Sequence, residues 1–351
     1  MATHRRWQVI KELLHADDHP TNSDAIGSER ISDEFSTFFI NKIAKISAKI
    51  KALITHGTLL KKTKPEHATP ECLRQLDMIT VQDAIRVILN RSGKSSPLDY
   101  VPVSILRDCV DAFAPLIARL ANLSFSEGCF PDMFKTGQIR SLLKKPGVST
   151  SDMSNFRQIT NLNTIGKILE RLAMKQRRRH SDQSPNLGHL QSAYRTLHST
   201  ETAMTKVVSD LLSAVDGGEP SALLSLDISA AFDTLDHHRL LSRAHELFGF
   251  SDLVLKWMQS YLSDRQHCVA MGGCRSTFAT NLTGVPQGLE LGPFLFSIFT
   301  TPVGNIIDSF GVTYHQYADD TQLYTTIKLS SYDKLASLSA CADAVTSWPG
   351  E

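Results

Sequence analysis

The sequence has no run of consecutive apolar residues as long as the roughly 18 that cross a membrane, which argues against a membrane span. Its N-terminal stretch MATHRRWQVIKELLHADD is charged throughout, unlike the apolar core of a signal peptide. The six cysteines include no CxxC pair and have no His at zinc-finger spacing, which argues against a zinc module. We therefore expect an intracellular protein, in the nucleus or the cytoplasm, with reduced thiols.

The chain also has little net charge, only +1, but its charges are unevenly distributed. Residues 128–200 contain twelve Lys or Arg against four Asp or Glu, a local excess of eight positive charges. Such a basic segment is typical of a protein that binds a polyanion, and a solvated basic face explains it equally well. The run from Arg177 to His180 fits a localisation signal or a helix end.

What is present is enough for a large core, since the 351 residues are 42% hydrophobic and have the length of about two domains. Apolar periodicity, glycine and proline predict the following elements: a long amphipathic basic helix over 31–54, a linker over 57–71, helices over 80–92 and 102–126, a strand and turn over 138–147, a helix over 164–179, a buried strand over 221–227, a glycine-rich loop over 284–293 whose Pro293 begins the next helix, and a helix over 331–348 with Leu335, Leu338, Ala342 and Val345 on one face.

Two adjacent carboxylates stand between two strand-like stretches in HQYADDTQLY, residues 315–324. A solvated hairpin turn explains Asp319 and Asp320 when they are taken alone. A divalent cation explains them if a third acid joins them, and Asp227 at the end of SALLSLD is a candidate. Phosphoryl transfer with two divalent ions about 3.5–4 Å apart needs only such a set of oxygen ligands, and magnesium prefers them.

A site for nucleoside triphosphates also needs cations and close backbone approach. Lys145 in KKPG and Arg157 in NFRQI are expected on one basic hairpin. Gly288 in the loop GVPQGLELGP would allow the backbone to come close to the substrate, and the Gln287 amide offers a hydrogen-bond donor and an acceptor. Taken singly, each residue is more simply explained as part of a surface ion pair or a turn.

The order of these stretches carries more weight than any one of them. SLDISAAFDTLDH, GVPQG followed by LGP, and YADD resemble the polymerase motifs of reverse transcriptases from non-LTR (LINE-type, jockey-like) retrotransposons. The resemblance extends upstream through GKSSPLDYVP, NFRQITNLNTIGKILERL and QSAYRTLHSTETA, so it covers most of residues 75–348. The helix EFSTFFINKI also looks like the segment that precedes the polymerase in these elements.

The resemblance implies an α+β fold, the fingers and palm of a right-hand polymerase, with an antiparallel palm sheet flanked by helices and the thumb missing. It divides the chain into an N-terminal helical segment and linker (1–74), a fingers region (75–215) and an incomplete palm with interleaved fingers elements (216–351). The implied function is RNA-directed DNA polymerase. The implied partners are an RNA template, a DNA primer and deoxynucleoside triphosphates, with no membrane and no indication of oligomeric state.

The resemblance also implies residue roles. Asp227, Asp319 and Asp320 are the catalytic and metal-binding acids for two Mg²⁺ ions, with Mn²⁺ as an alternative, and Asp320 is the weaker or structural third acid. The nucleotide-binding residues are Lys145 and Arg157 at the triphosphate, Phe232 beside the sugar 2′ carbon, and Gln287 and Gly288 against the nucleotide and template.

The chain departs from the family pattern at two motifs. The family usually has Arg-Pro-Ile where this chain has Gln158 after Arg157, and a Ser with an apolar residue where it has Leu289-Glu290. We expect Glu290 to repel triphosphate and template unless it points to solvent. Since thumb and primer-gripping strands are also expected to be absent, a catalytically inactive or repurposed nucleic-acid-binding fragment remains the alternative to an active polymerase.

Overall fold

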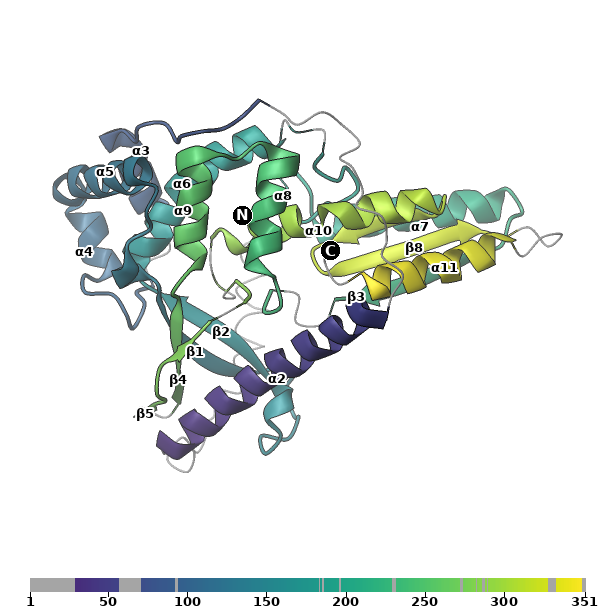
Figure 1. Cartoon of the computed structure of the whole chain (residues 1–351), viewed down its shortest axis with the longest axis horizontal. Coiled ribbons are helices and arrows are strands. Elements are labelled where there is room, and N and C mark those ends of the chain that lie inside the picture. The colour runs from purple at the N-terminus through teal and green to yellow at the C-terminus, as the bar shows by residue number, and fades with distance from the viewer. Residues whose placement is uncertain are drawn as a thin grey trace, which may run out of the picture.

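Two β-sheets and the helices around them make up the fold, which we describe from a computed structural model (Figure 1). The structure describes residues 29–56, 71–91, 94–182, 184, 186–195, 197–228, 232–271, 274–281, 283–285, 288, 290–327 and 333–348. Residues 57–70 of the predicted linker therefore lie outside the described residues.

The helices are α2 (Glu29–His56), α3 (Val81–Leu89), α4 (Val103–Asp108), α5 (Val110–Glu127), α6 (Thr164–Asp182), α7 (Thr200–Asp216), α8 (His237–Phe248), α9 (Asp252–Leu262), α10 (Gly292–Ser309) and α11 (Asp333–Ser347), with short 3₁₀ turns η2 (Asp132–Phe134) and η3 (Met153–Asn155). The strands are β1 (Thr136–Leu143), β2 (Phe156–Leu162), β3 (Ser221–Asp227), β4 (Gln266–Met271), β5 (Cys274–Arg275), β6 (Ala279–Thr280), β7 (Thr313–Tyr317) and β8 (Asp320–Thr326). None of the described helices is long and apolar enough to cross a membrane.

Helices α3 to α6, α8 and α9 gather around one apolar core (Figure 1). Its centre is aromatic, because the buried Trp257 ring meets Phe130 edge-on at 5.4 Å and stacks on Tyr261 at 5.5 Å. The single helix predicted over 102–126 is wrong, because Cys109 leaves the helical conformation (φ −111°, ψ +36°) and separates α4 from α5.

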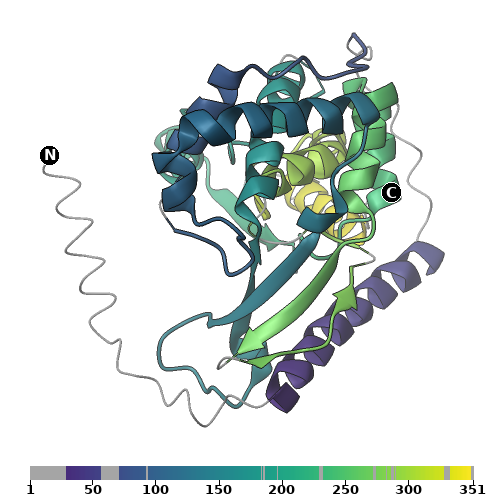
Figure 2. The ribbon, with the colours of Figure 1, turned by 90° about the vertical axis from the view of Figure 1, so that its left-hand side faces the viewer.

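The larger sheet has the order β2-β1-β4-β5, with β6 also paired to β4, and is mixed because β1 runs parallel to β4. Helix α2 lies along this sheet, as Figure 2 shows. Its periodic residues Phe35 and Phe39 are buried, and Phe35 meets the Phe156 ring edge-on at 5.0 Å. The predicted amphipathic helix is confirmed, since its apolar stripe covers the sheet and its lysines Lys45 and Lys49 are exposed.

The smaller sheet is antiparallel with the order β3-β8-β7. Helices α10 and α11 cover one face through a core that includes Leu323, whereas α7 approaches the other face, where the Tyr324 hydroxyl donates to Asp210 at 2.6 Å. The prediction that 221–227 is a buried strand is wrong in its burial: β3 is an edge strand, and Leu223 is 51% exposed.

The last helix, α11, confirms the helix predicted near the end of the chain. Leu338, Ala342 and Val345 are buried against α10 and the smaller sheet, together with Cys341. Leu335 shares this face by its spacing but is 40% exposed. The helix begins at Asp333, and Leu335 lies in its first turn, before the helix reaches the core.

Candidate active site

The adjacent acids lie at the tip of the hairpin formed by β7 and β8. Tyr317 pairs with Asp320, so Ala318 and Asp319 form a two-residue turn. Ala318 has φ +56°, a left-handed conformation that short antiparallel turns require and that few residues other than glycine adopt. The turn therefore projects Asp319 from the end of the smaller sheet in a backbone geometry that neighbouring contacts must maintain.

Strand β3 brings the third acid to this turn. Asp227 is the register partner of Asp320, and the Ile228 N–H donates to the Asp319 carbonyl at 3.3 Å. Residues far apart in the sequence thus meet at one end of the smaller sheet. We call Asp227, Asp319 and Asp320 the three-acid site.

The charges of the three-acid site are uncompensated by the rest of the described protein. Burial, followed by the nearby Asp319 and Asp227 carboxylates, raises the pKa of Asp320. Among the residues that the structure describes, no Lys or Arg forms an ion pair with these acids, and no group of three or more His, Cys, Asp or Glu side chains is gathered as a metal site. Asp227 and Asp320 are exposed, so their oxygens remain accessible to an added cation.

Phe232 lies beyond Asp227, where the glycine-rich loop holds the chain. Its ring stacks on Phe296 of α10 at 4.9 Å, and its carbonyl accepts a 2.7 Å hydrogen bond from the Val285 N–H. Gly284, with φ +81°, lies so close to the Asp233 backbone that an added Cβ would be 2.5 Å from the Asp233 carbonyl oxygen. Only glycine fits this approach, so the loop and the Phe232 segment form one packed unit.

The second half of the loop approaches the larger sheet. Gly288 is exposed, has φ +114°, and lies so near β2 that an added Cβ would be 2.6 Å from the Thr160 carbonyl oxygen. Gln287, the predicted partner of nucleotide and template, lies outside the described residues. The close neighbour of Gly288 in the described structure is therefore β2, and its predicted approach to nucleotide and template stays a prediction.

The side chain of Glu290 faces two arginines rather than solvent, and the repulsion of triphosphate and template that we expect of it stays a prediction. Its carboxylate pairs with Arg91 at 3.2 Å and with Arg171 at 3.2 Å, which compensates its charge locally. Its backbone N–H donates to the buried carboxylate of Glu170 at 2.9 Å. Burial, offset in part by Arg265, raises the pKa of Glu170 to about 7.

The two predicted triphosphate cations belong to the larger sheet. Strands β1 and β2 form the expected antiparallel hairpin, in which Arg157 lies opposite Leu142. Lys145 follows β1 in the connection to β2, and both cationic side chains are exposed. Within the described residues neither forms an ion pair with an acid, so the structure leaves both available without bringing them to the three-acid site.

Sequence reasoning assigned no role to several residues that surround these motifs. Gln191 hydrogen-bonds to the backbone of Ala318, and the pKa of Tyr194 is raised by burial and then by the Asp319 carboxylate. Both lie in QSAYR, a stretch that the family resemblance includes without assigning a role. No local periodicity marks them, because their contacts join them to a hairpin more than a hundred residues later.

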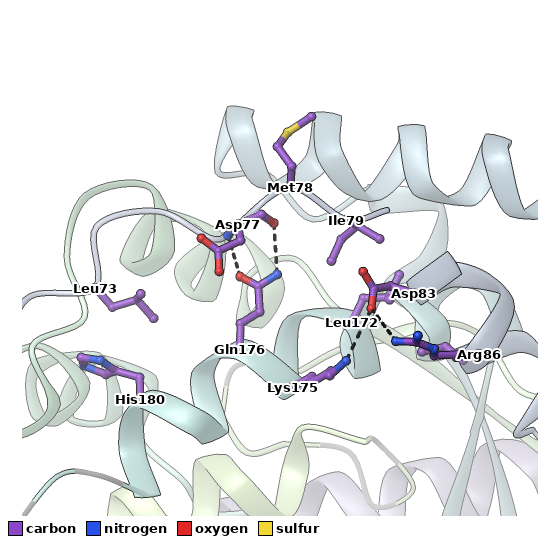
Figure 3. Close-up of a pocket in the computed structure, with 11 residues that line it drawn as sticks. Leu73, Asp77, Met78, Ile79, Asp83, Arg86, Leu172, Lys175, Gln176 and His180 are labelled. Atoms are coloured by element: carbon purple, nitrogen blue, oxygen red, sulfur yellow. Dashed lines mark hydrogen bonds and ion pairs between the residues drawn. The ribbon is translucent and has the colours of Figure 1, made fainter. Parts of the chain in front are cut away.

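A cavity of about 480 Å³ lies elsewhere, between the segment before α3, α3 itself and α6 (Figure 3). Its charged residues compensate one another, since Asp83 pairs with Lys175 at 3.4 Å and Arg86 at 3.8 Å. Gln176 bonds to both backbone groups of Asp77. None of the predicted site residues that the structure describes lines this cavity, so it is separate from the three-acid site.

Comparisons with known proteins agree with the motif order. A sequence model described as reverse transcriptase (RNA-dependent DNA polymerase) matches residues 143–348, more than half of the chain. The RNA-directed DNA polymerase from the mobile element jockey of Drosophila melanogaster is 30% identical over 280 residues, which is 78% of this chain and 30% of that protein.

Two further relatives extend the similarity. The probable RNA-directed DNA polymerase from transposon BS of Drosophila melanogaster is 28% identical over 251 residues, 70% of this chain and 27% of the relative. The retrovirus-related Pol polyprotein from the type-1 retrotransposable element R2 of Popillia japonica is 36% identical over 81 residues, 23% of this chain and 13% of the relative. The chain thus spans about 30% of the length of the jockey polymerase and less of these two. With its mixed α+β fold and acidic hairpin, this chain belongs to the reverse transcriptase family, among those of non-LTR, LINE-type retrotransposons.

Proposed function

We propose that this chain is an RNA-directed DNA polymerase that extends a DNA primer on an RNA template with deoxynucleoside triphosphates. The observation that carries the proposal is the pairing of Asp227 with Asp320 beside Asp319, which brings the backbones of three acids from two motifs to one end of an antiparallel sheet. A solvated turn would need no third carboxylate. Uncompensated acids in this position are what metal-assisted nucleotidyl transfer requires.

The donors of the three-acid site fit two Mg²⁺ ions in kind, since they are hard oxygen ligands without competing cations among the described side chains. In this proposal Asp227 and Asp319 hold the ions, and Asp320 is the weaker third acid. Bound magnesium supplies a Lewis acid for the attacking oxygen and for the leaving group. Burial and then the neighbouring Asp319 and Asp227 carboxylates raise the pKa of Asp320, and an added cation would relieve the second of these causes.

The remaining site residues are proposed to bind the nucleotide. Phe232 lies beside the sugar 2′ carbon of the nucleotide, supported by its stacking on Phe296. Gly288 and Gln287 together allow the chain to approach template and nucleotide. Lys145 and Arg157 reach the triphosphate from the β1–β2 hairpin, supported by their exposure.

We further propose that the smaller sheet with α10 and α11 is the palm and that the larger sheet with the helices around the Trp257 core belongs to the fingers. The proposed regions are 1–74 before the fingers, 75–215 for the fingers and 216–351 for an incomplete palm with interleaved fingers elements, which here are α8, α9 and β4 to β6. The support is topological, because the three acids end strands of the smaller sheet whereas the exposed cations Lys145 and Arg157 lie on the larger one.

The test is primer extension by the purified chain on an RNA template, with and without Mg²⁺. We expect magnesium-dependent extension that Asp227→Asn abolishes, because one carboxylate ligand is lost without a change in shape. Asp216→Asn is a matched control, since Asp216 is exposed at the end of α7, near the opposite end of β3. Retained extension in Asp227→Asn would refute the assignment. Binding of template and primer without extension by the wild-type chain would instead favour the nucleic-acid-binding fragment.

A further inference from the structure

A segment far upstream lies along the outer strand of the acidic hairpin. The Gln316 N–H donates to the Leu190 carbonyl at 2.9 Å, and the Ser192 N–H donates to the Gln316 carbonyl at 2.9 Å. These bonds form a parallel bridge between Gln191 and Gln316 beside β7. The Ser192 hydroxyl is also 2.8 Å from His315 Nε2, so the segment is fixed on β7 by backbone and side chain.

The Gln191 side chain continues from this bridge to the turn itself. It is only 5% exposed, and both of its polar atoms are satisfied by backbone groups. Its Oε1 accepts from the Ala318 N–H at 3.0 Å and from the Ala193 N–H at 3.1 Å, while its Nε2 donates to the Ala318 carbonyl at 3.2 Å. One amide group therefore holds the peptide units on both sides of the Ala318 Cα.

These two bonds act where the backbone is strained. Ala318 has φ +56°, which is unfavourable for a residue with a Cβ, so surrounding contacts must maintain it. Because one bond precedes the Cα and the other follows it, together they restrain both φ and ψ of Ala318. The carbonyl that accepts from Nε2 belongs to the same peptide unit as the Asp319 nitrogen, so its orientation determines where Asp319 points.

We propose that Gln191 is a positioning residue for nucleotidyl transfer, which holds the turn so that Asp319 faces the metal ions. This inference rests on the proposed function, since the reaction gives Asp319 its role. The chemistry requires glutamine: a glutamate lacks the Nε2 donor and adds a negative charge beside the three-acid site, and an alanine lacks both bonds.

The main test compares Gln191→Ala with a matched control, Gln176→Ala. Gln176 makes the same pair of contacts, accepting from the Asp77 N–H at 2.6 Å and donating to the Asp77 carbonyl at 3.1 Å, but beside the separate cavity (Figure 3). We expect Gln191→Ala to lower kcat about tenfold to a hundredfold and to raise the Mg²⁺ concentration for half-maximal rate, with little change in the nucleotide KM. Gln176→Ala should change neither quantity.

Two further variants separate positioning from folding. Gln191→Glu keeps the Oε1 acceptor and the shape, so it should fold and still lose activity. Ala318→Gly should reduce the loss caused by Gln191→Ala, because glycine adopts a positive φ without strain. If Gln191→Ala and Gln191→Glu both kept the wild-type kcat and Mg²⁺ requirement, or if Gln176→Ala produced the same changes, the proposal would be overturned.

Binding of Mn²⁺ alone, followed by electron paramagnetic resonance, gives a readout that needs no polymerase activity. We expect weaker Mn²⁺ binding in Gln191→Ala and unchanged binding in Gln176→Ala. Equal binding by wild type and Gln191→Ala, including no binding by either, would overturn the positioning role. A wild-type chain that extends no primer but loses Mn²⁺ affinity through Gln191→Ala would refute the proposed polymerase activity and support the positioning of Asp319.

Discussion

Replacing Gly284 with alanine should destabilise the protein by displacing the segment that carries Phe232. The φ of +81° costs an alanine about 1–2 kcal/mol. The added Cβ would also lie 2.5, 2.7 and 2.8 Å from three backbone atoms of Asp233, and such overpacking costs about 1–3 kcal/mol. A gain of about 0.4–1 kcal/mol from the less flexible unfolded chain offsets part of this, so we expect a net loss of about 1–4.6 kcal/mol.

Gly147→Ala is the matched control for this prediction. Gly147 has nearly the same backbone, φ +78°, but no atom lies within 4 Å of its Cβ position. The backbone strain and the unfolded-state gain should then be equal in the two variants. Their free energies of unfolding should differ by the overpacking cost alone, about 1–3 kcal/mol.

Denaturant unfolding of the wild-type chain and both variants measures this difference. Primer extension in parallel should show a larger loss of activity for Gly284→Ala, because Val285 and Phe232 are joined by a backbone hydrogen bond of 2.7 Å. If both variants lost the same free energy of unfolding, the close approach of Gly284 to the Asp233 backbone would be refuted.

Three other predictions follow from the site. Phe232→Ala should increase ribonucleotide incorporation relative to deoxyribonucleotide, and an unchanged ratio would leave the ring with packing on Phe296 as its only role. Burial, opposed by Lys42, raises the pKa of Asp233 to about 6. The folded protein therefore binds more protons than the unfolded chain, and its free energy of unfolding should fall as pH rises from about 4 to about 6. Asp233→Asn should flatten this pH dependence, and an unflattened curve would show that Asp233 is not its source. Nucleic-acid affinity should fall steeply with salt, and charge reversal at Lys145 and Arg157 should make that dependence shallower; equal slopes would exclude these cations from the interface.

The sequence determined much of the local structure and predicted the acids that lie beside the hairpin turn. The period of apolar residues in the basic N-terminal stretch was sufficient to predict α2, because a helix must place such a stripe on one face. The hairpin around Asp319 was predicted from strand-forming residues on both sides of a compact polar step. The motif order then indicated Asp227 as the third acid, and β3 does pair with β8 at this position.

Only the tertiary structure decided which surfaces are covered and which polar groups meet. The apolar run ending at Asp227 predicted a buried strand, but β3 lies at a sheet edge and exposes Leu223. The charge of Glu290 had no visible partner in the sequence, because Arg91 comes from a helix end almost two hundred residues earlier. The amide of Gln191 likewise meets the Ala318 turn across a long sequence separation. Local periodicity encodes which face of an element is apolar, whereas burial and hydrogen bonding depend on the segments that long-range packing places against it.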